Sequence, residues 1–119
     1  MKKDKKYYYG QLKNIVDKIR YECIVLINET FERCENIDNY VIIETKEIFE
    51  KTAKEIDNKF DSCKRIIYYN LENSDISNGD YYEVYQEIGK YRQEEKREVI
   101  NYLKYKLNES INNYNRNYN

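Results

Sequence analysis

The chain contains no proline and only three glycines, Gly10, Gly79 and Gly89. Proline and glycine are the residues that interrupt helices most strongly, and residues 11–78 contain neither. Residues 21–27 and 40–43 are rich in β-branched and aromatic types, which favour strands. The missing breakers and the helical periodicity around these segments outweigh that preference. We therefore expect an all-α protein.

Apolar residues recur at alternating intervals of four and three, which is the spacing of an amphipathic helix with one apolar seam. The first seam contains Leu12, Val16, Ile19, Cys23 and Leu26. The second contains Phe49, Ala53, Ile56, Phe60, Cys63 and Ile67. A third stripe, broken by polar residues 92–98 that could bend the helix, contains Tyr81, Tyr85, Ile88, Ile100, Leu103, Leu107 and Ile111.

Two segments rich in turn formers separate these stripes. Residues 35–39 form the first predicted turn, in which Asp38 would cap the next helix. Residues 73–79 form the second, after which Asp80 and Glu83 have the spacing of a capping box.

The stripes and turns predict one domain, residues 1–119, with helices over 7–35, 39–72 and 81–114 and mobile ends at 1–6 and 112–119. The helices would form an antiparallel three-helix bundle. Closing the first turn would place Leu12 opposite Cys63, Val16 opposite Phe60 and Cys23 opposite Ala53. The alternative is one continuous helix through the first two segments, about 90 Å long, which would need a coiled-coil dimer to bury its seam.

Histidine is absent, and this excludes the catalytic triads and metal sites that depend on it. An odd number of widely spaced cysteines argues against a disulfide framework and against zinc, so we expect three reduced core cysteines. Glutamates at helical spacing, such as Glu44, Glu47 and Glu50, alternate with lysines and indicate a solvated face. We therefore expect that the chain is not an enzyme and that it binds no cofactor, no metal and no small-molecule substrate.

The formal net charge is −1, so the overall field favours neither nucleic acid nor an anionic membrane. The basic N-terminus is followed by a polar helix where a signal peptide would need an apolar run. The longest apolar runs, 23–27 and 40–43, are far too short to span a bilayer. The sequence therefore predicts a cytoplasmic protein without a membrane partner.

Asn, Ile, Lys and Tyr occur 15 times each, and the codons of all four are rich in A and T. A low-GC genome would raise all four together without selection for function. Such genomes include those of many bacteria and their phages. Small size and this bias fit an accessory protein of a phage or mobile element, for example one that inhibits a host system.

The chain has more apolar residues than a monomeric bundle needs, since such a bundle buries one stripe on each helix. A surplus of this kind indicates a surface for a protein partner or for a second copy in a homodimer. Tyrosine suits such contacts because it adds apolar area and a hydroxyl at low entropic cost. The predicted interface residues are Ile24, Val25, Ile27, Val41, Ile42, Ile43, Tyr68 and Tyr69.

Nucleic-acid binding is the alternative function, because the N-terminus combines positive charge with rings that could stack on bases. Basic residues of the third helix could extend that surface. The residues of this hypothesis are Lys2, Lys3, Lys5, Lys6, Tyr7, Tyr8, Tyr9, Arg92, Lys96 and Arg97.

Overall fold

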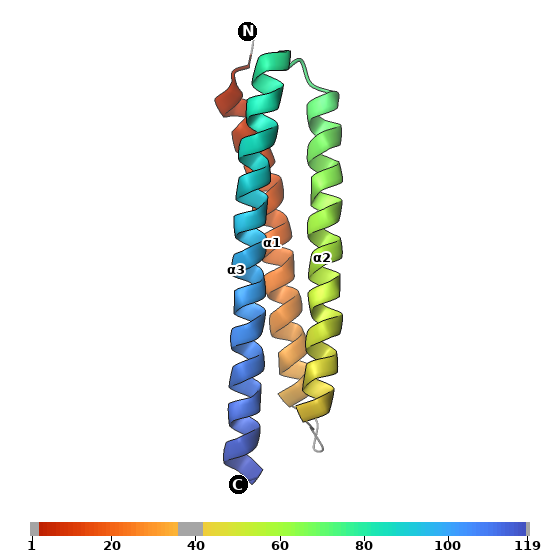
Figure 1. Ribbon diagram of the computed structural model, residues 1–119, viewed down its shortest axis with the longest axis vertical. Helices are drawn as coiled ribbons and strands as arrows, with labels where there is room; N and C mark the ends of the chain where they lie inside the picture. The colour runs from red at the N-terminus through yellow and green to blue at the C-terminus, as the bar shows by residue number, and fades with distance from the viewer. Residues whose placement is uncertain (1–2, 36–41, 119) are drawn as a thin grey trace.

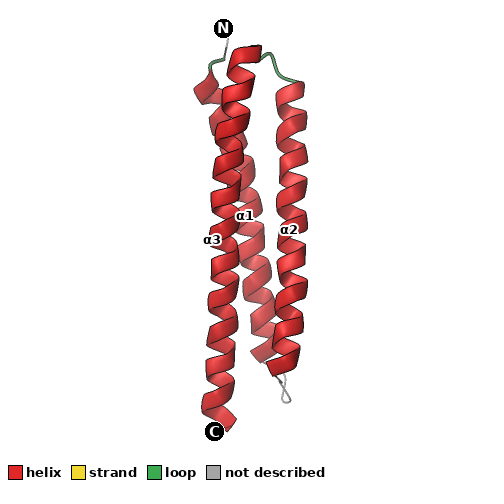
Figure 2. Cartoon of the chain, in the orientation of Figure 1, coloured by secondary structure: helices red, strands yellow, loops and turns green. Residues whose placement is uncertain are grey.

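The computed structural model describes the backbone of residues 3–35 and 42–118, and the side chains of residues 3–33 and 46–112. Three helices make up this part of the chain: α1 (Lys5–Glu35), α2 (Ile42–Glu72) and α3 (Asn78–Tyr118). The chain runs along α1, returns along α2 and runs forward again along α3 (Figure 1). Each helix packs against the other two, and the described residues contain no strand (Figure 2).

These contacts confirm the predicted all-α three-helix bundle. Because α1 and α2 lie side by side, they do not form one continuous helix, and the coiled-coil alternative is wrong. The predicted cap at Asp38 lies outside the described residues. Helix α3 is continuous through Gly89 and through polar residues 92–98.

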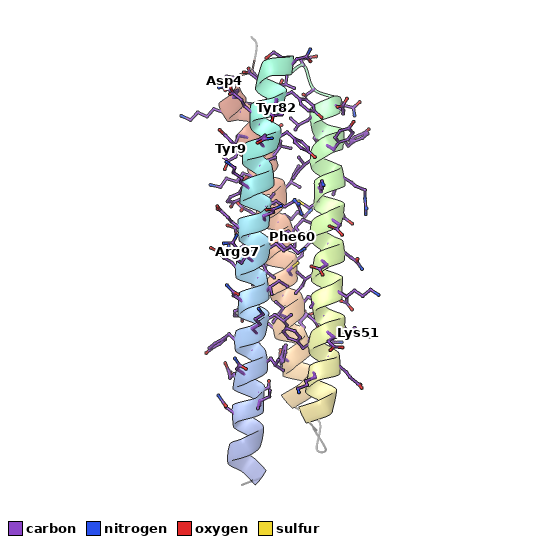
Figure 3. The ribbon with its side chains drawn as sticks, viewed as in Figure 1. Asp4, Tyr9, Lys51, Phe60, Tyr82 and Arg97 are labelled. Atoms are coloured by element: carbon purple, nitrogen blue, oxygen red, sulfur yellow. The ribbon has the colours of Figure 1, made fainter. Side chains whose placement is uncertain are left out.

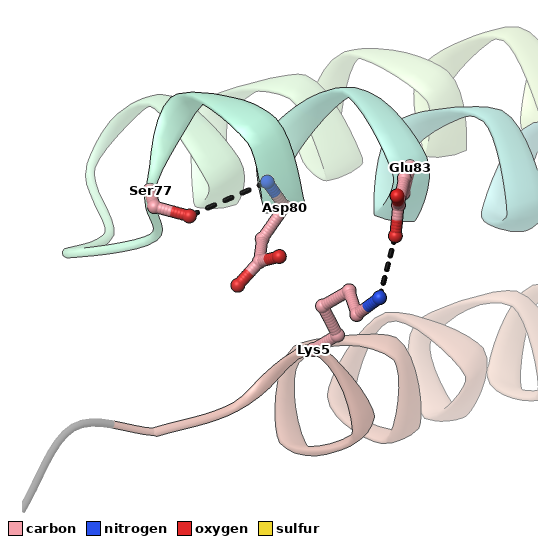
Figure 4. A network of polar contacts seen from close by, with 4 residues as sticks. All are labelled: Lys5, Ser77, Asp80 and Glu83. Carbon is pink, nitrogen blue, oxygen red and sulfur yellow. Dashed lines mark hydrogen bonds and ion pairs between the residues drawn. The ribbon is translucent and has the colours of Figure 1, made fainter.

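Two helix starts lie earlier in the chain than the sequence predicted. Helix α1 begins at Lys5, because the Asp4 carboxylate accepts a hydrogen bond from the Tyr7 backbone N–H at 3.0 Å. Helix α3 begins at Asn78, with Ser77 rather than Asp80 as its cap. The Ser77 hydroxyl accepts a hydrogen bond from the Asp80 backbone N–H at 3.3 Å (Figure 4). Lys5, Lys6 and residues 112–118, predicted to be mobile ends, are helical.

The core consists of two clusters along the axis of the bundle. Cluster 1 lies toward the start of α1 and contains Leu12, Val16, Cys63, Ile67, Leu71, Val84 and Ile88. Cluster 2 lies toward the end of α1 and contains Cys23, Ile27, Phe31, Ile56, Phe60, Val99 and Leu103. Partly buried Ile19 packs against both clusters and joins them.

The predicted register between α1 and α2 holds in part, since Leu12 and Cys63 share cluster 1 and Ala53 packs against cluster 2, which contains Cys23. Val16 and Phe60, predicted to face each other, belong to different clusters, and Phe60 packs with Cys23 instead. An ion pair of 3.8 Å joins Glu22 to Lys59, five positions beyond residue 54, which the predicted register places opposite Glu22. Two heptad stripes align about several turn centres, so the seams alone do not fix the register.

Helices α1 and α3 run parallel, and side chains 74 positions apart meet along their seam. The Tyr91 hydroxyl donates to the Asp17 carboxylate, and the Tyr102 hydroxyl donates to the side-chain oxygen of Asn28. This offset places residue 109 beside the end of α1, so the last nine residues of α3 extend beyond it by roughly 13 Å.

The bundle is a narrow rod, 65 Å long and 18 Å across in both other directions. None of the described helices is long and apolar enough to cross a membrane.

Candidate interaction surfaces

The predicted interface residues whose side chains the structure describes do not form one surface. Ile27 is fully buried in cluster 2, so its assignment to an interface is wrong: the third helix covers it. Ile24 packs against the same cluster and is partly buried, as is Val25. Val41, together with the side chains of Ile42 and Ile43, lies outside the described residues.

Tyr68 and Tyr69 remain exposed near the end of α2. Their exposed fractions are 52% and 67%, and that of the neighbouring Ile66 is 42%. We call Ile66, Tyr68 and Tyr69 the α2 tyrosine face. Tyr82, 65% exposed, lies at the same end of the bundle on α3 (Figure 3). This face is a concentration of exposed apolar and aromatic area, which is typical of a protein contact.

The aromatic residues beside this face are held in place by contacts within the bundle. The rings of Tyr81 and Tyr85 stack with their centroids 6.2 Å apart. The Tyr81 hydroxyl donates a hydrogen bond of 2.8 Å to Glu72 on α2. Burial, followed by this hydrogen bond, raises the pKa of Tyr81 to about 12. Tyr81 therefore stays neutral and fixes the start of α3 against the end of α2.

The N-terminal residues of the nucleic-acid hypothesis lie at the same end of the rod, but their charges are largely engaged. The Lys3 ammonium lies 4.6 Å from the centre of the Tyr7 ring and donates to its hydroxyl at 3.2 Å. Lys5 forms an ion pair of 2.6 Å with Glu83 (Figure 4). Tyr8 and Tyr9 pack against cluster 1, whereas Lys6 is exposed and Lys2 lies outside the described residues.

A cavity of about 900 Å³ opens beside these residues. Its lining is mainly polar and includes three carboxylates and one lysine. The residues that line it are Lys3, Asp4, Tyr7, Tyr8, Gln11, Asn70, Asn73, Ser74, Asp75, Ser77 and Asp80. This excess of negative charge does not suit a phosphate backbone.

The basic residues of α3 lie elsewhere, in a groove between α2 and α3. One part of it, about 370 Å³, is lined by Asp61, Arg92, Gln93, Lys96, Arg97, Ile100, Asn101 and Lys104. The adjoining part, about 160 Å³, is lined by Lys64, Ile67, Tyr85, Ile88, Gly89, Arg92 and Gln93. Arg92 and Gln93 belong to both parts, so we treat them together as the α2–α3 groove.

The predicted nucleic-acid residues are therefore divided between two surfaces. Lys5 lies beside Glu83 on the α1 side of α3, whereas Arg92 is nine residues further along and faces α2. Its guanidinium donates to the Phe60 carbonyl at 3.3 Å. Lys96 forms an ion pair of 2.8 Å with Asp57 of α2. The structure thus brings Arg92, Lys96 and Arg97 together but does not join them to the N-terminal segment.

Polar residues also meet midway along the seam between α1 and α3. Arg20 pairs with Glu95 at 2.9 Å and lies 3.9 Å from Glu98. Burial is the main cause that raises the pKa of Glu95, followed by the charge of Glu98, while Arg20 opposes the rise. Burial and the hydrogen bond to Asp17 likewise raise the pKa of Tyr91. Sequence reasoning missed this network because its partners come from two helices whose offset the stripes do not specify.

The cysteines offer no activated nucleophile among the described side chains. Cys23 and Cys63 are buried free thiols. Burial raises the pKa of Cys23 to about 11 and also raises that of Cys63, so both stay protonated. Among the described residues, no group of three or more His, Cys, Asp or Glu side chains is arranged to hold a metal ion.

Comparisons of the chain with known protein families, with curated proteins and with solved structures found no match.

Proposed function

We propose that this chain is a non-enzymatic protein–protein interaction module that binds its partner through the α2 tyrosine face. The exposure of Ile66, Tyr68 and Tyr69 within about one turn of α2 is the observation that supports it. Contacts of this kind are dominated by a few aromatic side chains, and removing one typically costs about 2 kcal/mol or more of binding free energy.

The surroundings of the face support the same proposal. Leu71 and Ile67 lie on the opposite side of α2 and are 2% exposed, so the backbone behind the tyrosines is anchored in cluster 1. A rigid helix presents its side chains without paying an ordering cost on binding. The partner is either a second copy of this chain or another protein.

The low-GC composition extends the proposal to biological context. A chain of 119 residues with a binding face fits an accessory protein of a phage or mobile element that acts by occupying a surface of a host protein. Inhibition of that host protein would then follow from the contact itself.

The test compares the wild type with Ile66→Asp and Tyr69→Asp. Self-association is measured by analytical ultracentrifugation. Capture of partners from a lysate of the source organism is measured with and without nuclease, at low and at high salt. We expect the wild type to form a dimer or to capture a protein partner that resists nuclease treatment. Both variants should lose this association, because each substitution places a charge in the contact.

Tyr21→Asp is the matched control, since Tyr21 is 70% exposed and belongs to α1. Circular dichroism should show the same helix content in all three variants. If assembly and capture are unchanged by Ile66→Asp and Tyr69→Asp, the α2 tyrosine face is not the interface.

A further inference from the structure

The α2–α3 groove concentrates positive charge in a chain whose net charge is −1. Its larger part holds four basic side chains and one carboxylate, and Lys64 adds a fifth cation in the adjoining part. Lys96 is paired with Asp57, but Lys64, Arg97 and Lys104 have no ion-pair partner among the described residues. These three cations are therefore available to an external anion.

The basic side chains are spread along the groove rather than gathered at one point. Arg92 and Lys96 are four residues apart on α3, which corresponds to about 6 Å, and Arg97 and Lys104 are separated by about 10 Å. A single phosphate or carboxylate would contact only part of this row. Charge complementarity therefore favours a chain of regularly spaced anions.

The adjoining part of the groove adds an aromatic ring and open space. Tyr85 lies in its wall, and the stacking contact with Tyr81 holds the ring in place. Gly89 lies next to it, one turn along the helix, and a Cβ atom at this position would meet nothing within 4 Å. The missing side chain leaves room for a flat group to approach Tyr85.

We propose that the α2–α3 groove binds single-stranded nucleic acid. The phosphates contact Lys64, Arg97 and Lys104, and a base lies over Gly89 against the ring of Tyr85. A positive groove combined with a stacking ring is the arrangement that binds single strands without sequence preference. A paired duplex keeps its bases stacked inside and offers none to Tyr85. This site shares no residue with the α2 tyrosine face, so either proposal can fail without the other.

The experiment measures fluorescence anisotropy of a labelled oligothymidylate of about 20 nucleotides, longer than the site size of a typical single-strand binding fold. The wild type is compared with Arg97→Ser/Lys104→Ser between about 50 and about 200 mM NaCl. We expect the double variant to bind about tenfold or more weakly at the lower salt. Its slope of log affinity against log salt should fall by roughly 1.4, because each single-strand phosphate contact contributes about 0.7.

Gly89→Leu tests the aromatic half of the site without changing any charge. The leucine fills the space beside Tyr85, and we expect a loss of at least about fivefold, comparable to removing one stacked base. Gly10→Leu is its matched control, because Gly10 also lies within a helix with open space for a Cβ and does not line the groove.

Three outcomes would overturn the proposal. The first is no binding by the wild type at the lower salt. The second is an equal loss in Lys18→Ser/Lys51→Ser, two exposed lysines outside the groove, since this would indicate unspecific attraction. Figure 3 shows Lys51 pointing away from the bundle. The third is a loss confined to Lys3→Ser/Lys6→Ser, which would assign binding to the N-terminal segment instead.

Discussion

Tyrosine is the commonest aromatic residue of this chain, and individual tyrosines have different structural roles. Tyr91 donates a hydrogen bond to Asp17, and the Lys13 ammonium lies 5.3 Å from the centre of its ring. Tyr69, in contrast, is 67% exposed. Composition cannot separate these roles, because a low-GC genome raises the number of all tyrosines alike. The burial of each tyrosine ring and its contacts within the bundle distinguish these roles, and both depend on how the third helix packs.

Phe60 is the clearest test of the core at this scale. It is fully buried where cluster 2 meets all three helices, and it lies between the ribbons in Figure 3. We expect Phe60→Ala to lower the free energy of unfolding by about 3–5 kcal/mol, since it leaves a cavity that the helices fill only in part. Urea denaturation followed by circular dichroism measures the change.

Tyr69→Ala is the control for Phe60, because an exposed residue of similar size should change stability by less than about 0.5 kcal/mol. A cost of less than about 1 kcal/mol for Phe60→Ala would contradict the placement of this ring in the core.

Glu95 gives a prediction about pH. Its side chain is only 13% exposed, and its pKa in the folded chain is raised above the ordinary value of 4.5. The folded state therefore holds this proton more tightly than the unfolded state, so ionisation of Glu95 lowers stability as pH rises through and above 4.5. Glu95→Gln cannot ionise. We expect the stability of Glu95→Gln minus that of the wild type to increase from pH 4 to pH 7.

Urea denaturation at several pH values measures this difference, and subtraction removes the contribution of the other carboxylates. A difference that decreases with rising pH would mean that attraction to Arg20 outweighs burial, which would lower the pKa of Glu95 instead of raising it.

At the scale of the helix, starts and stops depend on single polar contacts. The sequence predicted a cap at Asp80, whereas the chain enters α3 three residues earlier through Ser77. Residues 73–80 contain several residues that cap helices well, so composition marks the turn without choosing the cap. Asp80 then lies in the first turn of α3, where its negative charge interacts favourably with the helix dipole.

Ser77→Ala should therefore destabilise the bundle by about 1 kcal/mol, the usual cost of losing a cap. Thermal denaturation measures the shift in Tm. Ser62→Ala is the control, because Ser62 lies inside α2, where alanine is the better helix former. If Asp80→Ala costs more than Ser77→Ala, the helix starts where the sequence predicted.

Gly89 gives a second prediction for α3, in which a substitution raises stability instead of lowering it. It lies in the helix interior, and a Cβ there meets nothing within 4 Å. We expect Gly89→Ala to raise the free energy of unfolding by up to about 1 kcal/mol. Gly79→Ala, in the first turn of α3 rather than in its interior, should gain less. A loss of stability in Gly89→Ala would show that a neighbouring side chain occupies the space.

Much of the fold could be predicted from the seams, and the exceptions have a common cause. Leu12, Val16 and Cys23 are buried as predicted, but Ile27 is buried more deeply than Leu26. A helix with two neighbours buries a wider stripe than the two-position seam of a coiled coil. The sequence does not reveal which flank of that seam the third helix covers. The same uncertainty explains why the α2–α3 groove and the seam between α1 and α3 could not be predicted.

For the whole molecule, the radius of gyration separates this bundle from other arrangements of the same helices. The Cα atoms give 18.6 Å, whereas a compact domain of 119 residues has a radius of about 13–14 Å. We expect small-angle X-ray scattering of the monomer to give a value slightly above 18.6 Å, because scattering includes the side chains and hydration. A longest dimension near 90 Å would instead support the continuous helix of the coiled-coil dimer.

An odd number of long helices also separates the two ends of the chain. Because α1 and α3 run in the same direction, Lys5 and Tyr118 lie at opposite ends of a rod 65 Å long (Figure 1). Labels or domains fused to the two termini would be held apart by the bundle. A tandem copy joined at the end of α3 would begin at the far end of the first bundle and not beside the start of α1.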